Sequence, residues 1–82
     1  ILTSEGGAHA ALGGFQILPL KGQRGMYSPD ELRAHLRGKS RHTPTQRLVE
    51  VEQTANIGGG AVWPKRTLDE IAAIAKEHGL AT

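Results

Sequence analysis

The sequence predicts an α/β protein in which a mostly parallel sheet is flanked by helices. Segments typical of helices and of strands alternate along the 82 residues, and this order builds parallel sheets covered by helices. Two helix starts carry clear capping residues, and a run at 47–52 that contains two valines is bounded by turn residues. Only two full strands are present, so we expect residues 1–82 to be one incomplete part of a larger domain, without a domain boundary inside them.

Length and composition restrict the class of protein. A chain with one Trp, one Tyr and one Phe forms at most one small domain, and it buries only roughly 60% of its unfolded surface. There are no cysteines, which excludes disulfides and thiolate metal sites and fits a reducing cytoplasm. No apolar run approaches the roughly 18 residues of a membrane span, and no leader precedes the first motif. We therefore expect a cytoplasmic protein that does not bind membranes.

The first third of the chain predicts a short helix, a strand and a turn. Residues 4–12 form the helix, with Ser4 as its N-cap and two glycines that weaken its first turn. Residues 15–20 form the strand, in which Pro19 indicates an edge or an end, because proline has no N–H to donate. Residues 21–25 form the turn.

The second helix starts with a strong signal. Ser28 is the expected N-cap, Pro29 occupies the first helical position, and Glu31 completes a capping box. Gly38 is the expected stop. A polar loop then leads to 47–52, which is the best predicted strand in the chain.

The third helix is the most regular segment. Thr67 and Glu70 have the spacing of another capping box, and Gly79 is the expected stop. Between them, the apolar residues recur at helical spacing, which predicts one buried face.

A glycine-rich turn follows the 47–52 strand. Thr54, Ala55 and Asn56 lead into three consecutive glycines, and open α/β sheets bind ligands at the carboxyl ends of their strands. A nucleotide phosphate loop is excluded because no Gly-Lys-Ser/Thr follows. Taken alone, the glycines also fit an ordinary turn with positive φ.

Few other residues indicate chemistry. The four histidines lie far apart and predict no metal site. Glu5 lies beside Gly6 and Gly7, where a ligand can approach the backbone closely, although an acidic residue in a first helical turn has the same appearance.

A cluster of basic residues supports an alternative function. Five cations within 15 positions would suit a small nucleic-acid-binding module: Arg33, Arg37, Lys39, Arg41 and Arg47. No aromatic side chains lie among them to stack on bases, and a solvated basic surface explains them equally well. A structural segment without any ligand is the third interpretation.

Several short motifs together resemble the pyridoxal-phosphate-dependent threonine aldolases. They match in order and spacing across nearly all 82 residues, and they are Ser4-Glu5-Gly6-Gly7-Ala8, Pro19-Leu20, Ser28-Pro29-Asp30, Arg47-Leu48-Val49, Glu52-Gln53-Thr54-Ala55-Asn56-Ile57-Gly58-Gly59-Gly60, Val62-Trp63-Pro64 and Glu77-His78-Gly79-Leu80. The resemblance implies the large domain of a fold-type-I enzyme, similar in architecture to aspartate aminotransferase and the β-eliminating lyases. It also implies an oligomer that cleaves β-hydroxy-α-amino acids to glycine and an aldehyde, with pyridoxal 5′-phosphate as cofactor.

The resemblance assigns four residues to the site. Glu5 lies in the active-site wall as the catalytic candidate, while Thr54 and Asn56 contact the cofactor. Ala55 faces the substrate at a position where many threonine aldolases carry a histidine that contacts the substrate hydroxyl. Alanine cannot accept that proton, so we expect a relaxed choice of β-substituent.

Much of the family's catalytic machinery has no counterpart in residues 1–82. The family has a ring-stacking histidine before the Ser-Glu-Gly-Gly-Ala segment, and later Asp-Gly-Ala-Arg and Ser-Lys-Gly motifs that hold the cofactor ring and bind it covalently. None of the lysines matches the last motif. We therefore expect this stretch to be catalytically inactive alone and to need the remainder of its polypeptide.

Overall fold

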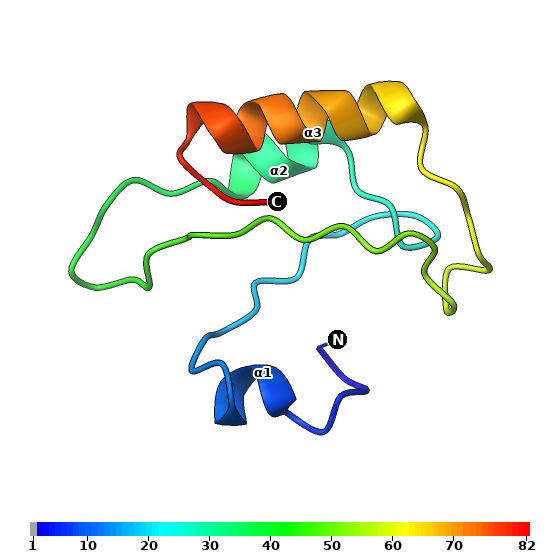
Figure 1. Cartoon of the computed structure of the whole chain (residues 1–82). Helices are drawn as coiled ribbons and strands as arrows, with labels where there is room; N and C mark the ends of the chain where they lie inside the picture. The colour runs from blue at the N-terminus through cyan, green and yellow to red at the C-terminus, as the bar shows by residue number, and fades with distance from the viewer. Residues whose placement is uncertain (1) are drawn as a thin grey trace.

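The computed structural model describes residues 2–82, and within them three helices surround irregular, extended segments (Figure 1). The helices are α1 (Ala8–Ala11), α2 (Pro29–His35) and α3 (Lys65–Glu77). Helices α2 and α3 pack against each other, whereas α1 contacts neither of them. Figure 1 shows α1 set apart, on the other side of the extended segments.

The core lies between the α2 and α3 layer and the extended segments. Its buried members come from both helices and from the chain around 49 and 63: Leu32, Val49, Trp63, Ile71, Ile74 and Ala75. The Cα extents are 37 × 32 × 17 Å. Since a helix with its side chains is about 10 Å thick, the thin dimension accommodates one helical layer on one extended layer.

Helix α2 begins as its sequence predicts. Ser28 Oγ accepts the backbone N–H of Glu31 at 3.1 Å, and Pro29 occupies the first turn. The capping box is only half formed, because the Glu31 carboxylate accepts the backbone N–H of Lys21 at 3.1 Å. The helix ends at His35, three residues before the expected glycine.

The predicted start of α3 is wrong by three residues, because the N-cap is Pro64 and not Thr67. The helix begins at Lys65, after Pro64, and Thr67 makes no capping bond. Ion pairs four residues apart stabilise the extra turn, from Lys65 to Asp69 at 2.6 Å and from Arg66 to Glu70.

The expected stop of α3 at Gly79 is confirmed. Gly79 has φ 67°, its N–H donates to the Lys76 carbonyl, and the Leu80 N–H donates to the Ala75 carbonyl at 2.8 Å. These two bonds form a Schellman motif, which requires the left-handed conformation that glycine adopts easily.

The mostly parallel sheet is not confirmed, because residues 2–82 contain no regular strand. Residues 47–52 form only one parallel bridge, Leu48 with Ala81, through bonds from Val49 N–H to the Ala81 carbonyl and from Ala81 N–H to the Arg47 carbonyl. Burial still alternates as in a strand, since Val49 is buried and Leu48 is 58% exposed. The predicted strand at 15–20 is irregular.

The predicted first helix is wrong in its start and its cap. Helix α1 covers only Ala8–Ala11, its N-cap is Gly7, and Ser4 makes no capping bond. Gly6 and Gly7 have φ of 57° and 77°, so the chain cannot be helical between Ser4 and Ala8.

Candidate functional site

The glycine-rich segment forms a closed loop, residues 53–63, which we call the site loop. Two hydrogen bonds join its ends: the Trp63 N–H donates to Gln53 Oε1 at 2.8 Å, and the Trp63 indole Nε1–H donates to the Glu52 carbonyl at 3.1 Å. Trp63 is only 3% exposed. The loop is therefore fixed to the core at its base, in the manner of a short Ω-loop.

An aromatic pair secures this base. The Tyr27 ring meets the Trp63 ring edge to face, with centroids 5.1 Å apart, and the Tyr27 hydroxyl donates to the Glu50 carbonyl at 2.9 Å. Burial, and secondarily the Glu50 carboxylate, raises the pKa of Tyr27 to about 12. Tyr27 is therefore a neutral hydrogen-bond donor at physiological pH, and it positions the chain just before the site loop.

The three glycines close a tight turn within the site loop. The Gly59 N–H donates to the Asn56 carbonyl at 2.9 Å, and the Gly60 N–H donates to the Ala55 carbonyl at 3.1 Å. Both glycines have positive φ, 74° and 67°. Because these N–H groups are used inside the turn, it differs from a phosphate loop, whose backbone amides point at the ligand.

A second turn, residues 23–26, packs against the site loop; we call it the Arg24 turn. Gln23 and Met26 exchange backbone hydrogen bonds of 2.9 and 3.0 Å. Arg24 and Gly25 have φ of 54° and 80°, the positive values that a type I′ turn needs at both central positions.

The two turns fit together closely. A Cβ added at Gly58 would collide with the Arg24 carbonyl, and one added at Gly25 would come within 2.6 Å of the Ala55 Cβ. The Arg24 side chain reaches over the site loop, where its Nε–H donates to the Gly58 carbonyl at 3.4 Å. Glycine is therefore favoured at 58, where the Arg24 backbone approaches closely, and at 25, where φ is positive and the Ala55 side chain occupies the space.

The structure brings together three of the four residues assigned to the site. Thr54 and Asn56 are exposed on the site loop, and Ala55 is half-buried against the Arg24 turn. Glu5 is exposed in the segment before α1, and within residues 2–82 no hydrogen bond or ion pair joins it to the site loop. Its role in catalysis stays a prediction.

Sequence reasoning missed Arg24. The only local signal was the Arg24-Gly25 pair at a turn, and Arg is an unusual first residue for a type I′ turn. Within residues 2–82, Arg24 is the only non-glycine residue with positive φ. Such strain often accompanies functional positions.

The side chains on this loop fit part of the predicted cofactor. Thr54 carries a hydroxyl, Asn56 an amide and Arg24 a guanidinium, so these donors suit phosphate or phenolate oxygens. No lysine belongs to this group, and the Lys65 amine is occupied by Asp69. The described residues therefore offer donors of the kind that the oxygen atoms of pyridoxal phosphate accept, and none of them offers a lysine for its covalent attachment.

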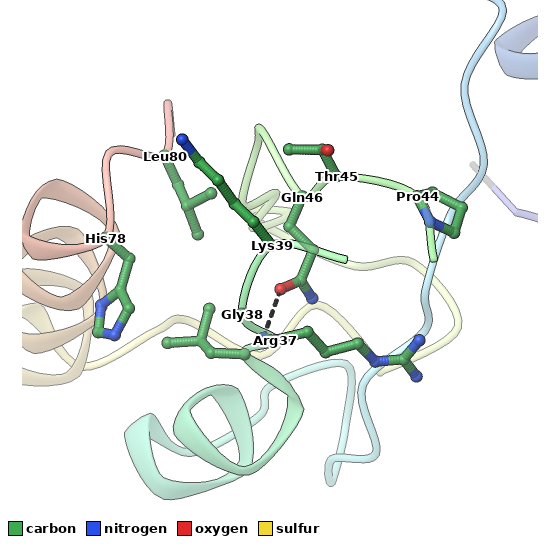
Figure 2. Close-up of a pocket in the computed structure, with 9 residues that line it drawn as sticks. Arg37, Gly38, Lys39, Pro44, Thr45, Gln46, His78 and Leu80 are labelled. Atoms are coloured by element: carbon green, nitrogen blue, oxygen red, sulfur yellow. Dashed lines mark hydrogen bonds between the residues drawn. The ribbon is translucent and has the colours of Figure 1, made fainter. Parts of the chain in front are cut away.

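A separate cavity of about 120 Å³ lies between the end of α2, the following loop and the end of α3 (Figure 2). Arg37 and Lys39 line it, but Figure 2 shows their charged groups pointing in different directions. Arg33, from the same basic cluster, pairs with Asp30 at 3.2 Å. Arg33 is thus paired with a carboxylate, and the charges of Arg37 and Lys39 point away from each other around this cavity.

Neither a metal-binding cluster nor a membrane-spanning helix occurs among residues 2–82. His, Asp and Glu side chains nowhere gather in a group of three that could hold a metal ion. Within the same residues, no helix has both the length and the apolar character needed to cross a membrane.

Comparison with known proteins gives one result, and it covers the whole chain. A family model described as beta-eliminating lyase matches residues 1–82. No curated protein and no solved structure matches. The matched residues include the site loop and the Arg24 turn, and the chain therefore belongs to the beta-eliminating lyase family.

Proposed function

We propose that these residues form part of a pyridoxal-phosphate-dependent lyase that cleaves threonine-like β-hydroxy-α-amino acids to glycine and an aldehyde. The observation that carries the proposal is the family match across residues 1–82, since members of this family typically depend on pyridoxal phosphate. The threonine-like substrate rests on the motifs around Glu5 and Thr54. The donors on the site loop, which suit an oxygen-rich ligand, support the same cofactor.

Each site residue has a proposed role. The Thr54 hydroxyl and the Asn56 amide bind oxygen atoms of the cofactor and orient it. Glu5 orients the substrate or a water molecule. When bound, pyridoxal phosphate supplies the electron sink for cleavage of the Cα–Cβ bond, while the protein supplies orientation, exclusion of water and proton transfer.

Residue 55 bears on the choice of substrate. An alanine methyl group cannot accept the proton of the substrate β-hydroxyl, so another residue must do so. The half-buried Ala55 lies directly against Gly25, so a larger side chain at 55 has to extend away from the Arg24 turn or shift it. We propose that the enzyme therefore accepts several β-substituents.

The residues that bind the cofactor covalently and pair with its ring nitrogen are proposed to come from sequence outside residues 1–82. We also propose that the complete enzyme is a homo-oligomer with sites between its subunits. Residues 1–82 produced alone should bind no cofactor covalently.

The products of the reaction test the proposed function. The full-length protein, supplied with pyridoxal phosphate, is incubated with threonine, phenylserine, serine and cysteine, and the products are identified by mass spectrometry. We expect glycine with acetaldehyde from threonine and glycine with benzaldehyde from phenylserine. Pyruvate and ammonia from serine or cysteine, without glycine from threonine, would instead assign a β-elimination reaction.

A matched pair of variants tests the site residues. Thr54→Val removes a hydroxyl while keeping the side-chain shape, and we expect cofactor affinity to fall about fivefold to tenfold, as for one hydrogen bond. Thr45→Val, at an exposed position in the loop after α2, is the control. Equal cofactor affinity in both variants would remove Thr54 from the proposed site.

A further inference from the structure

We propose that Arg24 is an anion-binding residue of the site: its Nε–H holds the site loop, and its Nη groups bind a carboxylate or phosphate oxygen of the ligand. The choice of ligands rests on the proposed function, whereas the anion chemistry rests on the geometry of Arg24 itself. The ligand oxygen has two sources, the carboxylate of the amino-acid substrate and the phosphate of the cofactor. Both have the same chemistry for a guanidinium.

The position of Arg24 is fixed by its backbone. It occupies the first central position of a type I′ turn, at φ 54°, where Asn, Asp or Gly fits with less strain. An arginine there costs on the order of 1 kcal/mol relative to glycine. The turn alone therefore does not favour arginine, and we infer that the side chain has a function of its own.

The side chain is held at one of its donors and open at the others. The Nε–H bonds to the Gly58 carbonyl at 3.4 Å, and a Cβ built on Gly59 would lie 3.8 Å from Nη2. Within residues 2–82, Arg24 forms no salt bridge, and this bond to Gly58 is its only side-chain hydrogen bond. The Nη donors are therefore available to a ligand, and their fork suits a carboxylate or a phosphate.

Other donors of the site lie beside the same glycines. A Cβ built on Gly60 would lie 3.9 Å from Thr54 Oγ1, so Thr54 and Arg24 approach consecutive residues of one turn. Glycine at both positions adds no side chain beside the guanidinium at 59 or beside the hydroxyl at 60. An oxyanion above this turn would meet a positive charge and a neutral donor together.

Two substitutions separate the charge of Arg24 from its role in the turn. Arg24→Asn removes the charge and retains a residue that type I′ turns favour, so the turn and the fold should persist. Arg24→Lys keeps the charge and loses the planar fork. The control is Arg41→Asn, at an exposed position in the loop after α2, and the NMR signals of Gly59 and Gly60 without ligand report whether the site loop remains folded.

The first experiment needs no enzymatic activity. Inorganic phosphate and acetate are titrated into the full-length protein while NMR follows the amide signals of Gly58, Gly59 and Gly60. We expect saturable shifts in the wild type and in Arg41→Asn, weaker binding in Arg24→Lys, and a loss of affinity of about 10- to 100-fold in Arg24→Asn, as for a charged hydrogen bond. Wild-type signals that do not move, or equal shifts in Arg24→Asn, overturn the proposal.

The second experiment identifies the source of the anion. If Arg24 binds the cofactor phosphate, Arg24→Asn weakens binding of pyridoxal phosphate and leaves binding of pyridoxal unchanged. If it binds the substrate carboxylate, cofactor affinity is unchanged, and KM for the amino acid rises about 10- to 100-fold with little change in kcat. Unchanged values for both ligands overturn the proposal, whereas a wild type without lyase activity contradicts only the proposed function and leaves the phosphate titration to decide on Arg24.

Discussion

Tyr27 is the residue whose ionisation the fold alters most clearly. Its folded pKa of about 12 lies above the ordinary value of 10.0, first because the ring is buried and second because of the Glu50 carboxylate. Folding thus favours the neutral phenol. The resulting stability is fully present below pH 10, and it is lost as the pH rises through 12, because the unfolded chain releases the proton first.

Tyr27 is the single tyrosine of residues 1–82, and the difference in phenolate absorbance between the wild type and Tyr27→Phe isolates its ionisation in the full-length protein. We expect phenolate absorbance in the folded protein to appear near pH 12, about two pH units above that in denaturant. Tyr27→Phe should abolish the signal and flatten the fall in stability between pH 10 and 12. A folded-state midpoint at 10 would contradict the burial of this hydroxyl.

Ala55 allows a test of substrate choice at the level of one residue. Ala55→His adds a hydrogen-bonding group beside the proposed substrate hydroxyl, and because Ala55 lies against Gly25, the longer side chain has to extend away from the Arg24 turn or shift it. We expect cleavage of threonine relative to phenylserine to rise about fivefold to tenfold, as for one hydrogen bond. The ratio of kcat/KM values for the two substrates is the measurement.

The control for this variant is Ala55→Leu, which adds bulk beside the same turn without adding a hydrogen-bonding group. It should lower both rates and leave their ratio near that of the wild type. An unchanged ratio in Ala55→His would mean that residue 55 does not face the substrate, and the proposed relaxation of substrate choice would be withdrawn.

The candidate site was partly predictable from the sequence for a physical reason. Thr54 to Gly60 are neighbours in the chain, so turn chemistry alone marks them as a glycine-rich loop after an apolar run. Arg24 lies 34 residues from Gly58, and no local pattern indicates a contact over that separation. Its approach depends on tertiary packing, which the spacing of residues does not encode.

At the scale of the elements, the end of a helix was predictable where a single residue determines it. Ser28 caps α2 because its hydroxyl meets an N–H three residues ahead, and Gly79 ends α3 because it adopts positive φ. Thr67 has the same sequence pattern of a helix cap, but it does not cap α3. Pro64 and the two ion pairs of the first turn extend α3 past it, and a threonine inside a helix has no free N–H to cap.

The cap of α2 gives a prediction at this scale. Ser28→Ala removes the acceptor for the Glu31 N–H, and we expect the free energy of unfolding to fall by about 1 kcal/mol. Ser28→Asp keeps an acceptor at the N-terminus and should remain within about 0.5 kcal/mol of the wild type. Urea denaturation followed by circular dichroism measures both variants, and equal losses in the two would contradict a capping role.

The strands were the least predictable elements, because their regularity depends on neighbours distant in sequence. Residues 47–52 keep the alternating burial of a strand, yet only Leu48 has a partner, at Ala81. Residues 15–20 have no bridge within the described part of the chain. Both segments have a propensity for extended backbone, but a regular β-strand also requires a second chain segment paired with it in register.

At the scale of the whole molecule, one residue connects the core to the site. Trp63 belongs to the buried cluster under α3, its ring packs on Tyr27, and its two N–H groups donate to residues at the start of the site loop. Packing and site geometry therefore depend on the same side chain. A substitution at Trp63 should therefore change both the stability of the core and the geometry of the site loop.

Substitutions at Trp63 test this connection. Trp63→Leu removes the aromatic contact and the indole donor, and we expect stability to fall by about 3 kcal/mol, as for large core truncations. Trp63→Phe keeps an aromatic ring but leaves the Glu52 carbonyl without its donor, at a cost of about 1 to 3 kcal/mol. Phe15→Leu, at an aromatic residue that is 46% exposed, is the matched control and should change stability by no more than about 0.5 kcal/mol.

Urea denaturation followed by circular dichroism gives these stabilities, and hydrogen exchange at the Gly59 and Gly60 amides reports the site loop separately. Because both amides donate within the loop, their protection should fall in Trp63→Phe even under conditions in which α3 stays fully protected. Loss of protection at α3 and at the loop to the same degree would mean that Trp63 acts only through global stability. Full protection of both glycines in Trp63→Phe would show that the indole bond to Glu52 does not hold the site loop closed.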